Sequence, residues 1–525
     1  MSEASAVVEL LPRIATMPTR GNADTYRMTP ERAREVRERL CHELLSVVPV
    51  SYLFPASVVP SVPEAYALLD KYDWHISQAQ QRADALANMQ DSASEPLQPE
   101  YSKNRRGMAC GHVFRKGEPI FRCHDCSYDD TCVQCAMCYR HSIHALENHD
   151  VVFSVADDGD ACCDCGDDEA WNSDLGCEFH SLHPWNERDQ EASTASNHAS
   201  SEQTLDDIMA AVPDSVRHAL SEFCAMLMAF LLETLLHAPK QTQIVIGPDV
   251  VDSIKRQPTY ESAFPAKGKA RLDGDDGQES PPLFVALLWN DEKHSFNEVS
   301  DKILEVCSSL TPKDARHFAE MVDRQGRQVV SMSEDVRRLV IMARRIGVIY
   351  LLVTVQHAFD YFVEEVAGCV LSFIAELASA SLYNTSGPSP NGRAIKALIT
   401  STFMRPWHVA EWTEAPTTMR RDLFDPSHLC MLDTLLLLDT KMWKGARLQM
   451  RHLILDLLAC REAKRQIALQ FSVVYPRLIE TFILHDREPE HSVYHMAVQL
   501  FSVPSIASQL VIERLSLIHI SEPTR

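Results

Sequence analysis

The feature that most constrains this chain is the uneven placement of its cysteines. Ten of the sixteen fall within the 68 residues from Cys110 to Cys177, and the other six stand singly in apolar stretches. The first residues lack the basic start and apolar core of a signal peptide, so we expect the protein in the cytoplasm, and also the nucleus. In a reducing compartment, dense clustering favours metal ions over disulfides. The six single cysteines are most simply core thiols.

The clustered residues come in close pairs, which is how proteins usually supply the four nitrogen and sulfur ligands of a tetrahedral zinc ion. The pairs are Cys123 and Cys126, Cys135 and Cys138, His144 and His149, Cys163 and Cys165, and Cys177 and His180. Cys110 precedes the first pair by thirteen residues. The sequence therefore predicts a zinc-built module.

The chain is acidic, with 50 Lys+Arg against 73 Asp+Glu and a formal charge of −23. From Cys110 to His180 there are 15 acidic and 4 basic side chains. A zinc module for nucleic acid would need Lys and Arg on its ligand-bearing loops, so we expect no nucleic acid as a partner. We also expect no membrane, because the apolar stretches Phe223–Leu236 and Ile349–Phe362 contain Glu, Asp or His and are typical of buried helices.

Linkers and helical patterns predict a mainly α, multidomain protein with small α/β and zinc-stabilised, loop-rich modules. The expected parts are an N-terminal helical region (1–103), the zinc module (104–183), a linker and helical segment with a flexible insertion (184–281), an α/β domain (282–350), a helical region (351–514) and a non-native tail (515–525). The tail resembles sequencing-adapter read-through, so we expect the natural protein to continue further. No internal repeat is apparent.

Local signals fix several elements within these parts. Helices are expected from residue 30 to about Val47 and over 63–89, and the runs PLFVALLW and RQVVSM have the length and composition of strands. Residues with the side chains that open helices are Thr29, Ser295, Thr311 and Ser333.

The runs CGHVFRKGEPIFRCHDCSYDDTCVQCAMCY and CCDCGDDEAWNSDLGCEFH resemble the UBR box of the fungal Ubr-type N-recognins, which are E3 ubiquitin ligases of the N-degron (N-end rule) pathway. The resemblance implies three zinc ions, two of which share a thiolate. The implied ligand sets are Cys123, Cys126, His144 and His149; Cys110, Cys135, Cys138 and Cys163; and Cys138, Cys165, Cys177 and His180.

One ligand departs from the family spacing. The family commonly has HxxH where this chain has His144 and His149 with four residues between, so a two-residue insertion must bulge out. His141 with His144 would restore HxxH, but His141 stands too close to Cys138 to match the pattern. Cys132 and Cys162 receive no metal and are expected to be packed thiols.

The resemblance also implies a site for the first residue of a protein. Asp129 would take the α-ammonium, while Asp164, Asp167 and Thr131 would take the side chain of Arg, Lys or His. Two carboxylates held by neighbouring zinc ligands suit a guanidinium. Phe114 and Val133 would flank the second residue of the peptide.

Residues 282–347 resemble the ClpS-like domain that accompanies the UBR box in one branch of the family, through ALLWNDEKHSFNEV and EMVDRQGRQVV. The resemblance implies that Asn290 and Asp291 bind the α-ammonium of a peptide whose first side chain is bulky and apolar. The bacterial domain has a histidine where this chain has Asp323. A plain strand-to-helix turn would also account for Asn-Asp.

These resemblances imply the substrate-recognition portion of a RING-type E3 ubiquitin ligase in ubiquitin-dependent degradation. No RING series of cysteines follows Cys177, so the RING and the contact with the ubiquitin-conjugating enzyme would lie in a missing C-terminal part. A zinc hydrolase is disfavoured because every ligand set closes at four. The alternative left open is a zinc-stabilised interaction scaffold that binds no N-terminal residue, and the presence of Asp129, Asp164 and Asp167 argues against it.

Overall fold

The computed structural model describes most of the chain. The described residues are 6–19, 22–53, 101, 106, 109–114, 117–129, 131–145, 149–156, 161–167, 170–171, 175–181, 204–210, 212–238, 249–257, 282–290, 292–307, 310–379, 392–407, 429–486, 488, 492–501, 506–508 and 510. The expected helix at 63–89, most of the expected insertion and the expected non-native tail lie outside them.

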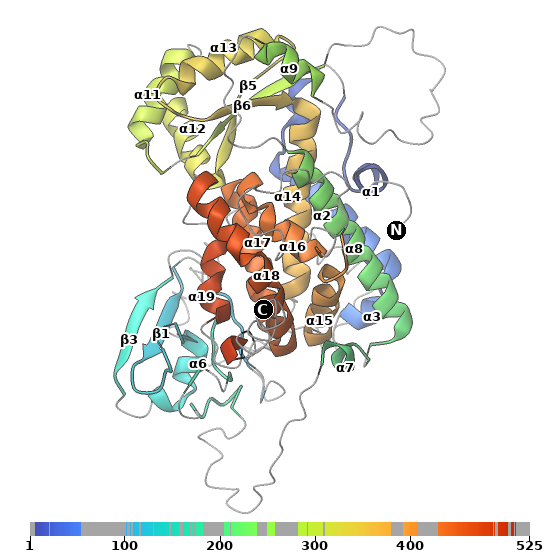
Figure 1. Ribbon diagram of the computed structural model, residues 1–525, viewed down its shortest axis with the longest axis vertical. Helices are drawn as coiled ribbons and strands as arrows, with labels where there is room; N and C mark the ends of the chain where they lie inside the picture. The colour runs from blue at the N-terminus through green and yellow to red at the C-terminus, as the bar shows by residue number, and fades with distance from the viewer. Residues whose placement is uncertain are drawn as a thin grey trace, which may run out of the picture.

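The mainly α, multidomain fold class is confirmed. Figure 1 shows a central body of helices, a small α/β domain at its upper end, and a loop-rich module against its lower left side.

The central body is built from helices of both halves of the chain, which share one hydrophobic core. Its longer helices are α1 (Ala6–Ile14), α2 (Pro30–Val47), α8 (Asp214–His237), α14 (Ala358–Ser379), α15 (Gly392–Phe403), α17 (Lys444–Leu458) and α18 (Arg461–His485). The shorter ones are η1 (Ala23–Tyr26), α3 (Val50–Leu53), α7 (Leu205–Ala210), α16 (Met431–Leu437), η9 (Asp439–Lys441), η11 (Val493–His495) and α19 (Met496–Phe501).

Two helices of this body are long and apolar enough to cross a membrane, judged by length and composition alone. Among the described residues, these are α8 and the part of α18 from Arg461 to Leu484. Of the most apolar 18-residue stretch in each helix, 67% is buried inside the protein in α8 and 28% in α18. The prediction of a buried helix over Phe223–Leu236 is confirmed by α8, whose side chains lie in the shared core. The prediction for Ile349–Phe362 is wrong in part, because a strand occupies its middle.

The α/β domain contains a three-stranded antiparallel sheet with the order β5-β4-β6. Its elements are β4 (Phe284–Trp289), α11 (Phe296–Val306), α12 (Pro312–Gln325), β5 (Arg327–Ser333), α13 (Val336–Gly347) and β6 (Val353–His357), and α9 (Val250–Arg256) packs on α13. Every residue of β4 is buried, as expected of a central strand.

The local helix signals explain most of this order. Thr29 caps α2, and Ser295 and Thr311 form capping boxes that open α11 and α12, as predicted. Ser333 does not cap α13; it ends β5, and the side chain of Asp335 accepts the amide hydrogens of the first turn instead.

The α/β domain is fastened to the helical body by a buried charge cluster. The guanidinium of Arg327, at the start of β5, pairs with Glu364 and Glu365 of α14 and stacks 3.8 Å from the ring centroid of Trp443. Gly326 has φ +84°, and a Cβ there would lie 2.4 Å from the backbone nitrogen of Lys444. This close approach and the buried ion pairs fix the domain against α14 and α17.

The loop-rich module has little regular structure of its own. Its sheet has the order β2-β1-β3, from Gln134–Cys135, Pro119–Cys123 and Val151–Val155, and two short helical segments follow β2, α6 (Ala136–Arg140) and η5 (Ile143–Ala145). Most of the side chains in its core are cysteines and aromatics. A core this small depends on something besides apolar burial.

Candidate functional site

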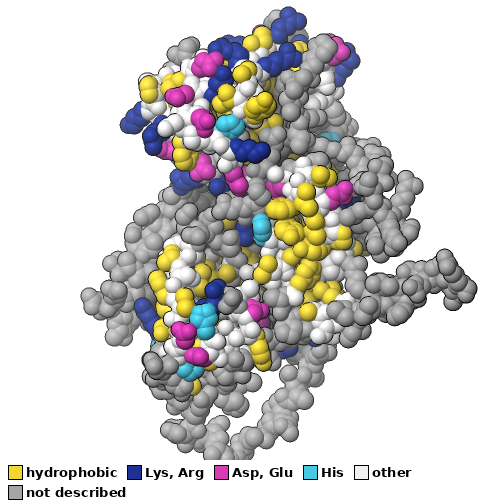
Figure 2. Space-filling view, turned by 60° about the vertical axis from the view of Figure 1, so that its left-hand side comes forward, with side chains coloured by type: hydrophobic (Ala, Val, Ile, Leu, Met, Phe, Trp, Pro, Cys, Tyr) yellow, Lys and Arg dark blue, Asp and Glu magenta, His cyan; other side chains and the backbone are white. Residues whose placement is uncertain are grey.

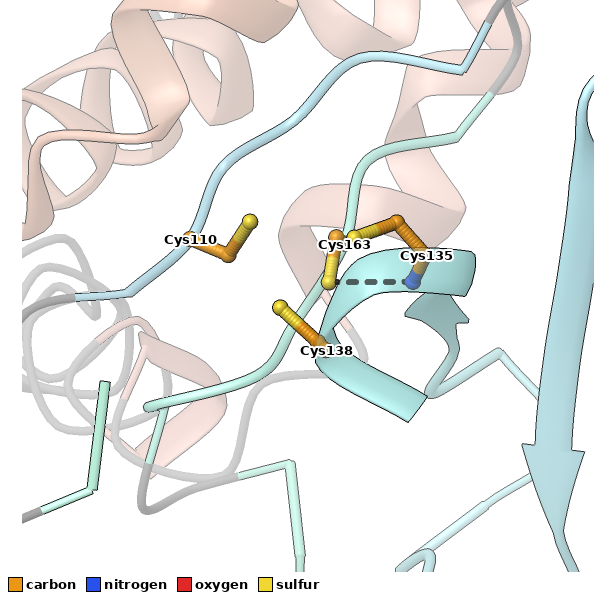
Figure 3. A group of neighbouring side chains, drawn as sticks. All are labelled: Cys110, Cys135, Cys138 and Cys163. Atoms are coloured by element: carbon orange, nitrogen blue, oxygen red, sulfur yellow. Dashed lines mark hydrogen bonds between the residues drawn. The ribbon is translucent and has the colours of Figure 1, made fainter. Parts of the chain in front are cut away.

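Three groups of cysteine and histidine side chains converge in the loop-rich module. They are Cys123, Cys126, His144 and His149; Cys110, Cys135, Cys138 and Cys163; and Cys138, Cys165, Cys177 and His180. Within each group all ligand atoms lie within 4.8 Å of one another. Figure 3 shows the second group, in which Cys135 approaches from the end of β2, Cys138 from α6, and Cys110 and Cys163 from two separate loops. The structure thus brings together the three sets implied by the family resemblance, with Cys138 common to two.

The distances within the groups fit a tetrahedral zinc ion. Zn–S and Zn–N bonds of about 2.3 and 2.0 Å at a tetrahedral angle place sulfur and nitrogen about 3.5 Å apart. The Nδ1 atom of His149 lies 3.5 Å from the sulfur of Cys123 and 3.3 Å from that of Cys126. The Nδ1 atom of His180 lies 3.4 Å from Cys138 and 3.7 Å from Cys177. These residues therefore fit the ion by geometry and by chemistry.

Neighbouring polar groups orient the histidines. The Nδ1 atom of His144 lies 2.8 Å from Oε1 of Gln134, which assigns Nε2 to the metal. The ring of His141 is directed elsewhere, with its Nδ1 2.9 Å from Glu178. His149, and not His141, therefore lies with His144 in the first group.

Three of the four thiols of the second group, Cys110, Cys138 and Cys163, have pKa values raised by burial and by neighbouring thiols. Burial, together with the neighbouring Cys110, Cys135 and Cys163 thiols, raises the pKa of Cys138 well above its usual value. A divalent ion at the centre would reverse this effect, because its charge stabilises thiolates directly.

The four residues implied to bind a basic N-terminus, which we call the acidic site, are Asp129, Thr131, Asp164 and Asp167. Asp129 accepts hydrogen bonds from the backbone nitrogen and the hydroxyl of Thr131, at 2.7 and 2.5 Å. Burial acts to raise the pKa of Asp129, but the hydrogen bonds from Thr131 and Cys132 outweigh it and lower the pKa. Asp129 is thus held ionised.

The other two carboxylates, Asp164 and Asp167, lie on the loop that carries Cys163 and Cys165. Asp164 lies between Cys163 and Cys165, and its Oδ2 accepts a hydrogen bond of 2.9 Å from the backbone of Val133. Burial raises the pKa of Asp164 to about 7, and the charges of Asp167 and Asp129 add to the rise. Asp164 therefore lies near enough to Asp129 and Asp167 for their negative charges to act on it, and a cation at this position would be stabilised.

The burial of neighbouring side chains bears on two sequence expectations for this site. Phe114 and Val133, expected to flank the second peptide residue, are 0% and 3% exposed and belong to the module core. Both present little surface to a peptide, and their contact with its second residue stays a prediction. Cys132 is buried as expected, whereas Cys162 is only partly buried.

The expectation that the six single cysteines are core thiols holds for four of them, since Cys307 and Cys369 are only partly buried.

A residue that the sequence did not suggest also contacts the acidic site. The ammonium of Lys464, in the first turns of α18, lies 3.6 Å from Oδ2 of Asp167. The Lys464 and Asp167 side chains are 16% and 21% exposed. Burial acts to lower the pKa of Lys464, but the charges of Asp167 and Asp164 outweigh it and raise the pKa.

The second implied site lies where β4 leaves the α/β domain. The amide nitrogen Nδ2 of Asn290 donates a hydrogen bond of 2.9 Å to Oε1 of Glu488, from the helical body. Asp291 lies outside the described residues. Asp323, at the position of the bacterial histidine, pairs with Lys444 at 3.8 Å.

Glu488 was not found by sequence reasoning and is a strong candidate for this second site. Its side chain is 5% exposed, and burial raises its pKa to about 7 although Asn290, Arg447 and Lys444 oppose the rise. A buried carboxylate with a raised pKa beside a residue implied to bind a ligand is typical of a functional position.

Comparison with family models matches three segments of the chain. Residues 109–180 match the putative zinc finger in N-recognin (UBR box), residues 279–338 match the ATP-dependent Clp protease adaptor protein ClpS, and residues 368–522 match the UBR1/2/3-like ARM repeat domain. The last model is named for helical repeats, which are not apparent in the sequence of this chain, since such repeats can diverge until only their packing is shared.

Curated relatives are similar to most of this chain. The chain is 25% identical to E3 ubiquitin-protein ligase ubr1 of Schizosaccharomyces pombe over 475 residues, which is 79% of this chain and 22% of that protein. It is also 25% identical to UBR1 of Drosophila melanogaster over 428 residues and to UBR2 of Homo sapiens over 420, covering 80% and 78% of this chain and 20% of each relative.

The fold and the metal groups define a multidomain zinc-finger protein with an adaptor domain and a helical-repeat body. Its UBR box, ClpS-like and UBR-type ARM domains place the chain among the UBR-type N-recognins. The chain spans about a fifth of the length of the curated relatives it matches.

Proposed function

We propose that this chain is the substrate-recognition portion of a RING-type E3 ubiquitin ligase that binds N-degrons for ubiquitin-dependent degradation. The observation that carries the proposal is the acidic site, in which Asp164 lies between Cys163 and Cys165 and near the charges of Asp129 and Asp167. Such an arrangement is costly unless a cation occupies it. A basic N-terminal residue supplies two cations, its α-ammonium and its side chain.

In this proposal the UBR box binds type 1 N-termini, which begin with Arg, Lys or His. Asp129 takes the α-ammonium, since its hydrogen bonds from Thr131 keep it ionised. Asp164 and Asp167 take the basic side chain through charge-assisted hydrogen bonds. Acetylation of the N-terminus would remove the first of these cations.

Three zinc ions would hold the loops that carry these carboxylates, each in one of the three groups of four ligands. With all four positions filled by protein, such an ion has no place for a reacting water and serves a structural role. The UBR box therefore binds and does not catalyse.

The ClpS-like domain would bind type 2 N-termini, which begin with a bulky apolar residue. Asn290 and Asp291 take the α-ammonium, and Glu488 adds a third polar partner from the helical body. The RING and the site for the ubiquitin-conjugating enzyme would lie in the rest of the protein, which would act in the cytoplasm and the nucleus.

The test is binding of short fluorescent peptides to the whole 525-residue chain. Peptides beginning with Arg, Lys or His should bind, and their N-acetylated forms should not. Asp129→Ala should remove Arg-peptide binding and leave Leu-peptide binding intact, while Asp291→Ala should do the reverse, because each carboxylate serves only its own site.

Equal affinity for free and acetylated peptides would refute N-degron recognition and leave the alternative of a zinc-stabilised interaction scaffold. Mutual competition between Arg and Leu peptides would instead mean that one site binds both classes.

A further inference from the structure

The helical body places the ammonium group of Lys464 beside the acidic site. Lys464 lies 3.6 Å from Oδ2 of Asp167, and the backbone nitrogen of Asp167 donates a hydrogen bond of 3.0 Å to the carbonyl oxygen of Asp164 in the same turn. These are the two carboxylates assigned to the basic side chain of a type 1 N-terminus. Any ligand that reaches them meets the Lys464 ammonium already in place.

The contact is fixed by the way the UBR box docks on the body. Gly111 has φ +63°, and a Cβ there would lie 2.2 Å from the Cβ of Ala459, at the end of α17. The neighbouring Val113 packs against the core of the helical body. Because the two segments meet this closely, Lys464 is held facing the box.

The start of α18 is also unusual in its charge. Arg461, Lys464 and Arg465 fall in its first two turns, with Glu462 as the acidic residue of the first turn. Cations at a helix N-terminus are disfavoured by the helix dipole, so they need negative charge from elsewhere. For Lys464 that charge comes from Asp167 and Asp164 of the UBR box.

We propose that Lys464 is an internal competitor in the acidic site, which sets the affinity of the UBR box for basic N-termini by occupying the position of their side-chain charge. The proposal rests on the type 1 function proposed above. An incoming Arg, Lys or His side chain must displace the ammonium or share the carboxylates with it. Either course weakens binding, because like charges a few ångströms apart repel.

A lysine with a merely structural role would behave differently. If Lys464 only clamps the box onto α18, removing its charge loosens the acidic site and weakens Arg-peptide binding. If it competes, removing its charge strengthens binding. The sign of the change therefore separates the two roles.

The experiment measures peptide binding to the zinc-loaded 525-residue chain and to its Lys464→Met, Lys464→Arg and Lys302→Met variants. Lys302 is the matched control, since it pairs with Glu305 at 2.7 Å within the α/β domain and its side chain is 10% exposed. The probes are a peptide beginning with Arg, its N-acetylated form and a peptide beginning with Leu. Zinc content and melting temperature are measured for each variant.

We expect K464M to bind the Arg peptide about tenfold more tightly than the unmodified chain, equivalent to about 1.4 kcal/mol. K464R and K302M should bind it as the unmodified chain does, and Leu-peptide affinity should be the same throughout. The gain should shrink at high salt, because salt screens the charge that was removed.

Unchanged or weaker Arg-peptide binding by K464M, with zinc content and melting temperature preserved, overturns the proposal. If K464M loses zinc, Lys464→Gln replaces it, since its amide can still donate a hydrogen bond to Asp167, and the same outcomes apply. Absence of selective binding in every chain, including K464M, would refute the type 1 function itself. Binding that appears only in K464M supports both.

Discussion

Replacing Glu488 by Gln tests the second site through stability and binding together. The Glu488 side chain is 5% exposed and accepts a hydrogen bond from Asn290. Burial raises its pKa from 4.5 to about 7, the charge of Asp486 adds to the rise, and Asn290, Arg447 and Lys444 oppose it. Holding the charged form in this position therefore costs about 3 kcal/mol.

The pH dependence follows from the direction of this shift. Because the pKa is raised in the folded state, the group stabilises the fold fully below about pH 4.5, and that contribution is lost as the pH rises through about 7. Gln is neutral at every pH and keeps the shape and the acceptor oxygen. We therefore expect E488Q to have a higher unfolding free energy than the unmodified chain at neutral pH. The difference between the two chains should grow by about 1 kcal/mol from about pH 6 to about pH 8.

The assay is urea unfolding followed by tryptophan fluorescence, since Trp289 and Trp443 both lie against Arg327 at the same interface. The control is Glu320→Gln on α12, whose exposed side chain pairs with Arg316 at the surface and should show no such gain. If the unfolding free energies of E488Q and the unmodified chain depend on pH in the same way, Glu488 does not titrate with a raised pKa in the folded protein.

The binding arm of the experiment asks why a costly carboxylate is present. If Glu488 faces an α-ammonium, E488Q should bind Leu peptides more weakly while gaining stability, the usual exchange between stability and function at a binding residue. Binding by the unmodified chain should strengthen as pH rises through about 7 and weaken above about 8, where the peptide amine loses its proton. Unchanged Leu-peptide affinity in E488Q would remove Glu488 from the site.

The remaining predictions concern metal, the acidic site and the domain interface. Elemental analysis should find three zinc ions. A chelator should unfold the UBR box, because the free energy of metal binding at such sites also stabilises the fold. His149→Ala should lose one zinc ion, and His141→Ala should lose none. Asp129→Ala should abolish calorimetric binding of Arg, Lys and His peptides alike, and Asp167→Asn should weaken Arg and Lys peptides by about 1–3 kcal/mol. Arg327→Met should destabilise the chain by about 3–5 kcal/mol in urea unfolding, because it leaves Glu364 and Glu365 unpaired at a buried interface.

What the sequence predicted well depends on short separations along the chain. Pairs of metal ligands two to five residues apart, and capping residues three positions before a carboxylate, leave their chemistry visible in the spacing itself. Ser295 with Glu298 and Thr311 with Asp314 were found in this way. The metal groups also needed the family resemblance, because spacing alone does not say which pairs meet.

What the sequence missed depends on packing between distant segments. β6 was taken for part of a helix, because a strand buried among helices has no alternating pattern to distinguish it. Glu488 lies 198 residues from Asn290, and nothing in its local sequence marks it. Lys464 has the appearance of an ordinary surface lysine until the UBR box is placed against α18.

The two residues that the helical body contributes to the two sites have opposite charges. Lys464 adds a cation beside the carboxylates proposed to hold a basic side chain, and Glu488 adds a carboxylate beside the amide proposed to hold an α-ammonium. The first should weaken its site and the second should strengthen its own. The helical body should therefore bias the chain toward apolar N-termini over basic ones. Figure 2 shows part of the apolar surface of this body between the two smaller domains. K464M and E488Q should both shift the ratio of affinities toward Arg peptides, the first by tightening Arg binding and the second by weakening Leu binding. If both variants change the affinity for the same class of peptide, the helical body does not act on the two sites independently.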